Sequence, residues 1–270
     1  MAKEIETLYE DADLIALSKP AGLLTVRGRW DPDERTILDI LESRDPGVDF
    51  RLVHRLDKGT SGVLVLAKSL DAQRSLSQQW RDRVVRKVYL ALVAGSPEED
   101  EFTIDLPIEA APHRRKVVAG RSRGSKPALT ECRVVERFVG YALVEARPVT
   151  GRQHQVRAHL QAVGLPLAVD PLYGCPRPVL LSELKPRYKR KDREAPLIAR
   201  TSLHALRLEI NHPRTGERLS FEAPLPKDFA LTLKNLRRYK AIARPQTAHA
   251  AEPTAGSPSP PFPPGASSES

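Results

Sequence analysis

The segment from His54 to Lys68 has the residue types and spacing that catalysis by a carboxylate would need. It places Asp57 in a short polar turn, two residues after Arg55 and just before an aliphatic run over residues 62–67. A carboxylate anchored by a buried strand is held still, as a catalytic group must be. An aspartate close to a glycine is more commonly a plain turn residue. The segment by itself therefore leaves both interpretations open.

Short motifs that bind metals, nucleotides or redox cofactors are not found in the sequence. There is no His-Glu-x-x-His, no Cys-x-x-Cys, no glycine-rich phosphate loop and no Gly-x-Ser-x-Gly. His154 and His159 are five residues apart, which puts them on different faces of a helix and argues against a metal pair. The pattern favours chemistry carried out by side chains, with no metal and no other cofactor.

These residues need a scaffold, and the hydrophobic pattern predicts many short strands and few helices. Alternation and β-branched content predict strands over residues 14–17, 62–67, 87–93, 129–135, 142–146, 203–209 and 219–221. Helices are predicted over residues 36–43, 71–83, 153–162 and 227–238, with Asp71 as the N-cap of the second. Because strands and helices do not alternate regularly, we expect an α+β fold with a mixed, largely antiparallel sheet.

Charge and composition favour a polyanionic partner. The formal net charge is +9, and residues 1–244 carry 43 basic against 32 acidic residues, a net of +11. A soluble protein that is merely basic is the alternative. No apolar run approaches the roughly 20 residues that span a bilayer, and the first residues lack an apolar signal region. A cytoplasmic, monomeric protein without a membrane partner is expected.

Several motifs resemble those of the RluA-type RNA pseudouridine synthases, and they follow one another along the chain in the same order as in that family. The signature is His54-Arg55-Leu56-Asp57 followed by Thr60-Ser61-Gly62. The remaining matches are the segments 19–23, 87–93, 126–131, 150–160, 170–174, 203–205 and 212–213. The resemblance covers residues 8 to 226. It implies a mixed, bent sheet with flanking helices around a central catalytic cleft, and an enzyme that isomerises uridine in RNA to pseudouridine without a cofactor.

The resemblance also implies roles for single residues. Asp57 matches the catalytic aspartate, and Arg157 matches the arginine that keeps it ionised, through an expected planar two-point contact. Tyr89 matches a tyrosine that stacks on the target base. Arg55 matches an arginine that fills the space left by the flipped uridine. Lys19 is expected in a wall of the cleft. Taken singly, Arg157 would be an exposed helix arginine and Tyr89 a core tyrosine.

Two basic segments are expected to contact RNA. The alternative for each is a solvated loop, but acids are scarce in both and the second contains Tyr188. The first carries Arg114, Arg115, Lys116, Arg121, Arg123 and Lys126, and the second carries Lys185, Arg187, Lys189, Arg190, Lys191 and Arg193. A third expected contact consists of Arg27, Arg29 and Trp30. The partner is thus expected to be a structured RNA, with ribosomal and transfer RNA both open.

Two rival functions follow from the same residues. The first is a non-catalytic RNA-binding protein on the same scaffold, against which the presence of Asp57, Tyr89 and Arg157 counts. The second is a glycoside hydrolase, which needs a second carboxylate beside Asp57, and the sequence offers no obvious one. Whether Asp57 attacks the base or the sugar carbon is open.

Composition divides the chain into two parts. Residues 1–240 are expected to form the catalytic domain, and residues 241–270 a disordered tail rich in Pro, Ala and Ser. Seven of the 24 prolines lie between Pro245 and Ser270, where Phe262 is the only aromatic residue. Such a segment cannot bury enough apolar surface to offset the entropy of ordering it.

Overall fold

The computed structural model describes residues 5–27, 34–111, 116–120, 122–189 and 193–242. One ten-stranded sheet has the order β1-β2-β4-β11-β5-β10-β9-β6, with β12 paired to β11 and β3 paired to β4. Its strands are Glu6–Glu10 (β1), Leu14–Lys19 (β2), Arg51–Leu52 (β3), Ser61–Ala67 (β4), Arg86–Ala94 (β5), Glu101–Asp105 (β6), Leu129–Phe138 (β9), Tyr141–Pro148 (β10), Leu203–Asn211 (β11) and Arg218–Glu222 (β12). A separate hairpin pairs Ile108–Ala110 (β7) with Val117–Ala119 (β8).

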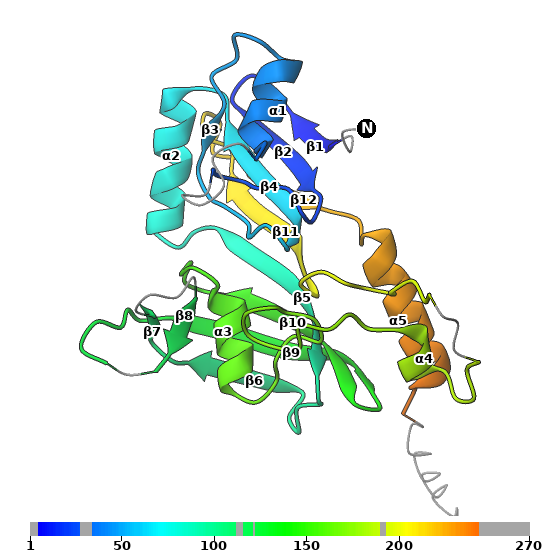
Figure 1. Cartoon of the computed structure of the whole chain (residues 1–270). Helices are drawn as coiled ribbons and strands as arrows, with labels where there is room; N and C mark the ends of the chain where they lie inside the picture. The colour runs from blue at the N-terminus through cyan, green and yellow to red at the C-terminus, as the bar shows by residue number, and fades with distance from the viewer. Residues whose placement is uncertain (1–4, 28–33, 112–115, 121, 190–192, 243–270) are drawn as a thin grey trace, which may run out of the picture.

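Helices cover the sheet on both faces (Figure 1). They are Ile37–Arg44 (α1), Leu70–Arg81 (α2), Gln155–Ala162 (α3), Leu181–Leu184 (α4) and Lys227–Tyr239 (α5). The alternation of β5 separates two cores, because successive side chains of a strand point to opposite faces. Leu90 and Leu92 pack with α5, whereas Ala91 and Val93 pack with α3. None of the helices in the described ranges is long and apolar enough to cross a membrane.

The predicted fold class is confirmed. Each predicted strand and helix has a counterpart, and every strand pairing in the described ranges is antiparallel except that of β4 with β11. The prediction of Asp71 as N-cap was wrong: α2 begins earlier because the Ser69 side chain accepts a hydrogen bond from the Ala72 N–H. The third helix begins at Gln155, since His154 has a left-handed φ of 51°.

Gly62 allows the parallel pairing at the centre of the sheet. Its φ is +121°, and a Cβ added there would lie 2.1 Å from the Ala205 carbonyl oxygen. A residue without a side chain is therefore required where β4 approaches β11. Ser61 and His204 hold the same junction through a contact of 2.9 Å between Oγ and Nδ1. This junction fixes the start of β4, and with it the turn that carries Asp57.

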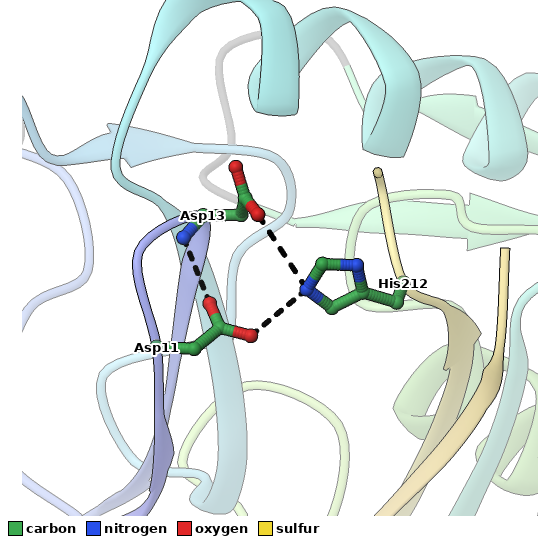
Figure 2. A group of neighbouring side chains, drawn as sticks. All are labelled: Asp11, Asp13 and His212. Atoms are coloured by element: carbon green, nitrogen blue, oxygen red, sulfur yellow. Dashed lines mark hydrogen bonds and ion pairs between the residues drawn. The ribbon is translucent and has the colours of Figure 1, made fainter. Parts of the chain in front are cut away.

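A polar cluster joins the β1–β2 turn to the β11–β12 turn (Figure 2). His212 Nδ1 accepts hydrogen bonds from the backbone N–H groups of Arg214 and Thr215, so its proton lies on Nε2. Nε2 donates to Asp11 at 2.8 Å, and the Arg214 guanidinium pairs with Asp13 at 2.6 Å. The chain's own donors thus satisfy both carboxylates, and the cluster ties two hairpins together.

The expected boundary at residue 240 is close to the last pairing described. Ala241 forms a β-bridge with Phe138, and the Lys240 carbonyl accepts from the Val139 N–H at 2.8 Å. Residues 243–270, most of the expected tail, lie outside the described residues.

Candidate active site

A pocket of about 330 Å³ lies between the turn that precedes β4 and the first turn of α3. Segments distant in the sequence meet in it: the loop before β4, the end of α2, the start of β5 and the loop after β10. Its lining consists of Val53, His54, Arg55, Leu56, Asp57, Thr60, Trp80, Lys87, Tyr89, Pro148, Thr150, Gly151, Arg152, Gln153, His154, Gln155, Val156, Arg157 and Leu203. This volume falls within the range of small-molecule sites.

The Asp57 turn is held by backbone hydrogen bonds on both sides of the carboxylate. The Thr25 hydroxyl donates to the Leu56 carbonyl at 2.8 Å, and the Gly22 N–H donates to the Lys58 carbonyl at 2.7 Å. The Asp57 carbonyl accepts from the Thr60 N–H at 3.0 Å, which closes the turn. The Asp57 side chain is 20% exposed. A fixed, partly exposed carboxylate therefore faces the pocket.

Arg157 connects Asp57 to a second, fully buried carboxylate. Its Nη1 donates to Asp57 Oδ2 at 2.7 Å. Its Nε and Nη2 donate to the two oxygens of Asp170 at 2.7 and 2.8 Å. The expected two-point contact therefore forms with Asp170, whereas Asp57 receives one bond. Asp170 also accepts from the backbone N–H groups of Leu172 and Tyr173, which fix its orientation.

The guanidinium of Arg157 stays charged in this site. Burial opposes its charge, but hydrogen bonds to Asp170 and the negative charges of Asp57 and Asp170 raise its pKa above the ordinary value. Only 4% of Arg157 is exposed, so the guanidinium lies mostly out of water. The ion pairs with both aspartates are accordingly screened little by solvent. This arrangement can hold an ionised carboxylate in one orientation.

His154 provides a second group beside Asp57. Its Nδ1 lies 3.0 Å from the Tyr173 hydroxyl, which itself accepts from the Val117 N–H at 2.6 Å. The hydroxyl proton is then directed to Nδ1, and a neutral His154 carries its own proton on Nε2, 3.5 Å from Asp57 Oδ1. Burial lowers the pKa of His154 despite the nearby Asp57 charge, so the ring is a neutral donor.

Tyr89 and Arg55 both line the pocket, as expected from the sequence, whereas Lys19 does not. Burial, and then the charge of Asp57, raise the pKa of Tyr89, so its phenol stays protonated. Arg55 is exposed. Lys19 is 1% exposed, and its Nζ donates to the carbonyls of Pro20 and Leu23. Lys19 is thus outside the pocket lining, and its ammonium supports the chain behind the Asp57 turn.

None of the described residues of the two basic segments lines the pocket. Arg114, Arg115 and Arg190 lie outside the described residues, as do Arg29 and Trp30. Lys116 is half-buried next to β8 and absent from the pocket lining. Exposed Lys185, Arg187 and Lys189 follow α4, whose Leu184 packs with Phe229 of α5. Lys185, Arg187 and Lys189 therefore lie on the face of the sheet opposite to α3.

Three residues of the site were not singled out from the sequence: Asp170, His154 and Tyr173. Each lies in a segment that carried the family resemblance, 150–160 or 170–174, so a signal was present. The missing information was spatial. Nothing in the spacing indicates that Asp170, 113 positions after Asp57, lies behind Arg157.

Comparisons with known proteins agree with this geometry. The family model for RNA pseudouridylate synthase matches residues 13–162. Ribosomal large subunit pseudouridine synthase D of Neisseria meningitidis serogroup B is 39% identical over 239 residues, which cover 86% of this chain and 61% of that protein. The protein of the same name from Nitrosomonas europaea is 39% identical over 249 residues, which cover 89% of this chain and 68% of the relative.

A solved structure gives the same result at the level of the fold. Human RNA pseudouridylate synthase domain containing 4 superposes with a TM-score of 0.65 at 28% identity, and the match covers 86% of this chain and 92% of the human one. The chain spans about three fifths of the length of the Neisseria relative, 61%. With the family model matching more than half of its residues, the chain belongs to the RNA pseudouridylate synthase family.

Proposed function

We propose that this chain is an RNA pseudouridine synthase that converts uridine to pseudouridine within a folded RNA. The observation that supports this most strongly is the chain of contacts from Asp170 through Arg157 to Asp57 at the pocket. It supplies an oriented carboxylate beside an aromatic side chain, Tyr89, in a space of nucleotide size. Family membership supports the same reaction.

The reaction needs no external reactant. The N1–C1′ bond of the uridine breaks, the base rotates and a C5–C1′ bond forms, while C5 loses a proton and N1 gains one. Asp57 acts as the nucleophile in this proposal, and Arg157 keeps it ionised and oriented. Because the target base cannot be reached in a helical stack, it must be flipped into the pocket. Exposed Arg55 is placed to fill the space that the base leaves.

Tyr89 is assigned to stacking on the flipped base. Its raised pKa keeps it a neutral phenol in the resting protein, which suits a stacking platform. A protonated phenol accepts a proton poorly, so removal of the C5 proton by Tyr89 would require its own proton to leave first.

The substrate proposed is large-subunit ribosomal RNA. The names of the Neisseria and Nitrosomonas relatives support that choice over transfer RNA. We also propose that a monomer acts and that it acts in the cytoplasm.

A glycosidase function has less support. The carboxylate bound to the same arginine as Asp57 is Asp170, which is fully buried and not part of the pocket lining. Its oxygens are used by Arg157 and by two backbone N–H groups. Asp170 therefore cannot serve as the second acid or base that a glycoside hydrolase requires.

The proposal is tested with Asp57→Asn, because an amide keeps the shape of the turn but cannot act as the nucleophile. Pseudouridine formation in a large-subunit ribosomal RNA transcript is measured by chemical labelling. We expect no turnover, with RNA affinity and melting temperature retained. Asp49→Asn is the control, since Asp49 is an exposed aspartate paired with Arg51. Wild-type turnover in Asp57→Asn would end the assignment.

A second experiment tests the basic segment after α4. Replacing Lys185, Arg187 and Lys189 by Glu should weaken RNA binding and reduce its dependence on salt. With fewer phosphate contacts, fewer counterions are released when the RNA binds. The single-turnover rate at saturating RNA should be unchanged, since the segment lies on the face away from the pocket. Normal affinity with an unchanged salt dependence would make the segment a solvated surface only.

A further inference from the structure

Lys87 is a cation in the pocket that the proposed reaction does not use. It lies on β5 two residues before Tyr89, so both side chains point to the same face of the strand, and both line the pocket. Its Nζ donates a hydrogen bond of 2.9 Å to the Thr150 carbonyl. A Cβ built on Gly151 would lie 3.8 Å from Nζ, so the ammonium lies against the loop that leads into α3.

No carboxylate balances this ammonium within the described part of the chain. None of the ion pairs found there includes Lys87. Burial lowers its pKa to about 8, and no neighbouring acid offsets that effect. A cation that is largely removed from water normally has an anionic partner or several hydrogen bonds. Lys87 has one hydrogen bond, to a neutral carbonyl.

Two neutral donors lie at the same end of the pocket. His54 Nε2 accepts from the Val65 N–H at 3.0 Å, so the neutral ring carries its proton on Nδ1. Burial, and then the charge of Lys87, lower the pKa of His54 to about 3, which keeps it neutral. Trp80 stacks on His54 with 4.7 Å between ring centroids. Among the described residues, neither His54 Nδ1–H nor the Trp80 indole N–H has an acceptor.

The charge balance of the pocket indicates an anionic ligand at this end. Arg157 is shared by Asp57 and Asp170, so these three side chains together carry one net negative charge. Arg55 and Arg152 line the pocket as well, and within the described ranges neither forms an ion pair with a carboxylate. Three lining cations, Arg55, Lys87 and Arg152, are thus without an acidic partner in the part of the protein described. A phosphate group beside Lys87 would give that ammonium an anionic partner and would offer acceptors to the neutral donors of His54 and Trp80.

We propose that Lys87 forms a phosphate subsite inside the pocket and binds the backbone phosphate of the nucleotide whose base stacks on Tyr89. Two residues of strand separate Lys87 from Tyr89 by about 7 Å, a span that the sugar of a single nucleotide can bridge. The inference rests on the proposed function, because it takes the flipped nucleotide as the ligand. It makes the pocket a site for a nucleotide rather than for a base alone.

Lys87→Gln tests the subsite because glutamine loses the charge but can still donate to the Thr150 carbonyl. Binding to an unmodified large-subunit ribosomal RNA transcript is measured over a range of salt concentrations. The slope of log affinity against log salt should fall by about 0.7, the value for one phosphate contact on a single strand. Arg86→Gln is the matched control: Arg86 is exposed, is not part of the pocket lining and lies next to Lys87 on β5. An unchanged slope in Lys87→Gln, or an equal change in both variants, overturns the proposal.

Lys87→Arg provides a second test if the glutamine variant folds poorly. Lys87 is a cation below about pH 8 and neutral above it, so wild-type RNA affinity should fall as pH rises from about 7 to 8.5, below the range in which uracil and guanine lose their ring protons. Arginine stays charged over that range, so the fall should disappear. Of the groups around Lys87, His54 is already neutral and Tyr89 stays protonated over that range. The other basic side chains that line the pocket are those of Arg55, Arg152, His154 and Arg157. An equal fall in both proteins overturns the subsite.

The two proposals can fail separately. Absence of pseudouridine after incubation with the wild-type protein would count against the proposed function, while the salt slopes would still decide whether Lys87 meets a phosphate. Normal pseudouridine formation together with an unchanged slope in Lys87→Gln would reject the subsite alone.

Discussion

Asp170→Asn removes the buried negative charge that pairs with Arg157 on the side away from Asp57. Asp170 is fully buried and accepts hydrogen bonds from Nε and Nη2 of Arg157 and from two backbone N–H groups. Removing one partner of a buried ion pair costs about 3–5 kcal/mol. Asparagine keeps one acceptor oxygen, so we expect about 3 kcal/mol, the lower end. At about 2–4 °C per kcal/mol for a chain of this size, the melting temperature should fall by roughly 6–12 °C.

The same substitution should also impair catalysis. Arg157 would lose one of its two bonds to residue 170 and the negative charge behind the other. A misplacement of about 1 Å that follows can lower a rate by about 10²-fold. We therefore expect a comparable loss in the single-turnover rate at saturating RNA. RNA affinity should be unchanged, because Asp170 does not line the pocket.

Asp228→Asn is the matched control. Asp228 accepts a similar two-point contact from Arg200, but its side chain is 35% exposed and lies on α5. Solvent screening limits such a pair to at most about 1 kcal/mol. Thermal unfolding followed by circular dichroism compares the two variants with the wild type. Equal shifts in both, or an Asp170→Asn protein with normal turnover, would refute the view that Asp170 positions Arg157.

Three further outcomes are expected. Arg157→Lys should lower the single-turnover rate by at least about 10²-fold, since lysine keeps the charge but not the planar fork; rapid-quench kinetics measures it. Gly62→Ala should lower the free energy of unfolding, measured in urea, by at least about 3 kcal/mol, because the added Cβ would overlap the Ala205 carbonyl. Gly47 also has a positive φ, +95°, but a Cβ added there would meet nothing within 4 Å, so Gly47→Ala should cost only about 1–2 kcal/mol. Burial lowers the pKa of Lys19 from 10.5 to about 7. Between these pH values the unfolded chain binds more protons than the folded one, so Lys19 makes stability rise with pH, and the urea midpoint of Lys19→Met should rise less.

The fold class and the central strands follow from the sequence because long apolar alternation decides them. β5 and β10 combine β-branched residues with burial on both faces, and α5 has a clear amphipathic period. The strands β1, β3, β6, β7 and β8 were not predicted. They are short, and polar or exposed residues interrupt them, so pairing with neighbours rather than local pattern forms them.

The site could be predicted in its residue types but not in its connections. Asp57, Arg55, Tyr89 and Arg157 lie at one pocket, in agreement with the motifs. The two hydrogen bonds from Arg157 to Asp170 depend on how the segment between α3 and α4 packs against α3, which spacing along the chain does not encode. The burial of Lys19 was not predicted either, because the two backbone carbonyls that bind its ammonium cannot be identified from residue types and spacing.

The position of β11 has a consequence for how the protein matures. β11 lies between β4 and β5 in the sheet, although it is made after both (Figure 1). The segments that carry Asp57 and Arg157 are therefore both synthesised before the strand that unites them. Contacts between residues so distant in sequence form late and slowly. In a nascent chain Asp57 and Arg157 would accordingly stay apart, and the protein would become able to modify RNA only after residues 203–211 have inserted between β4 and β5.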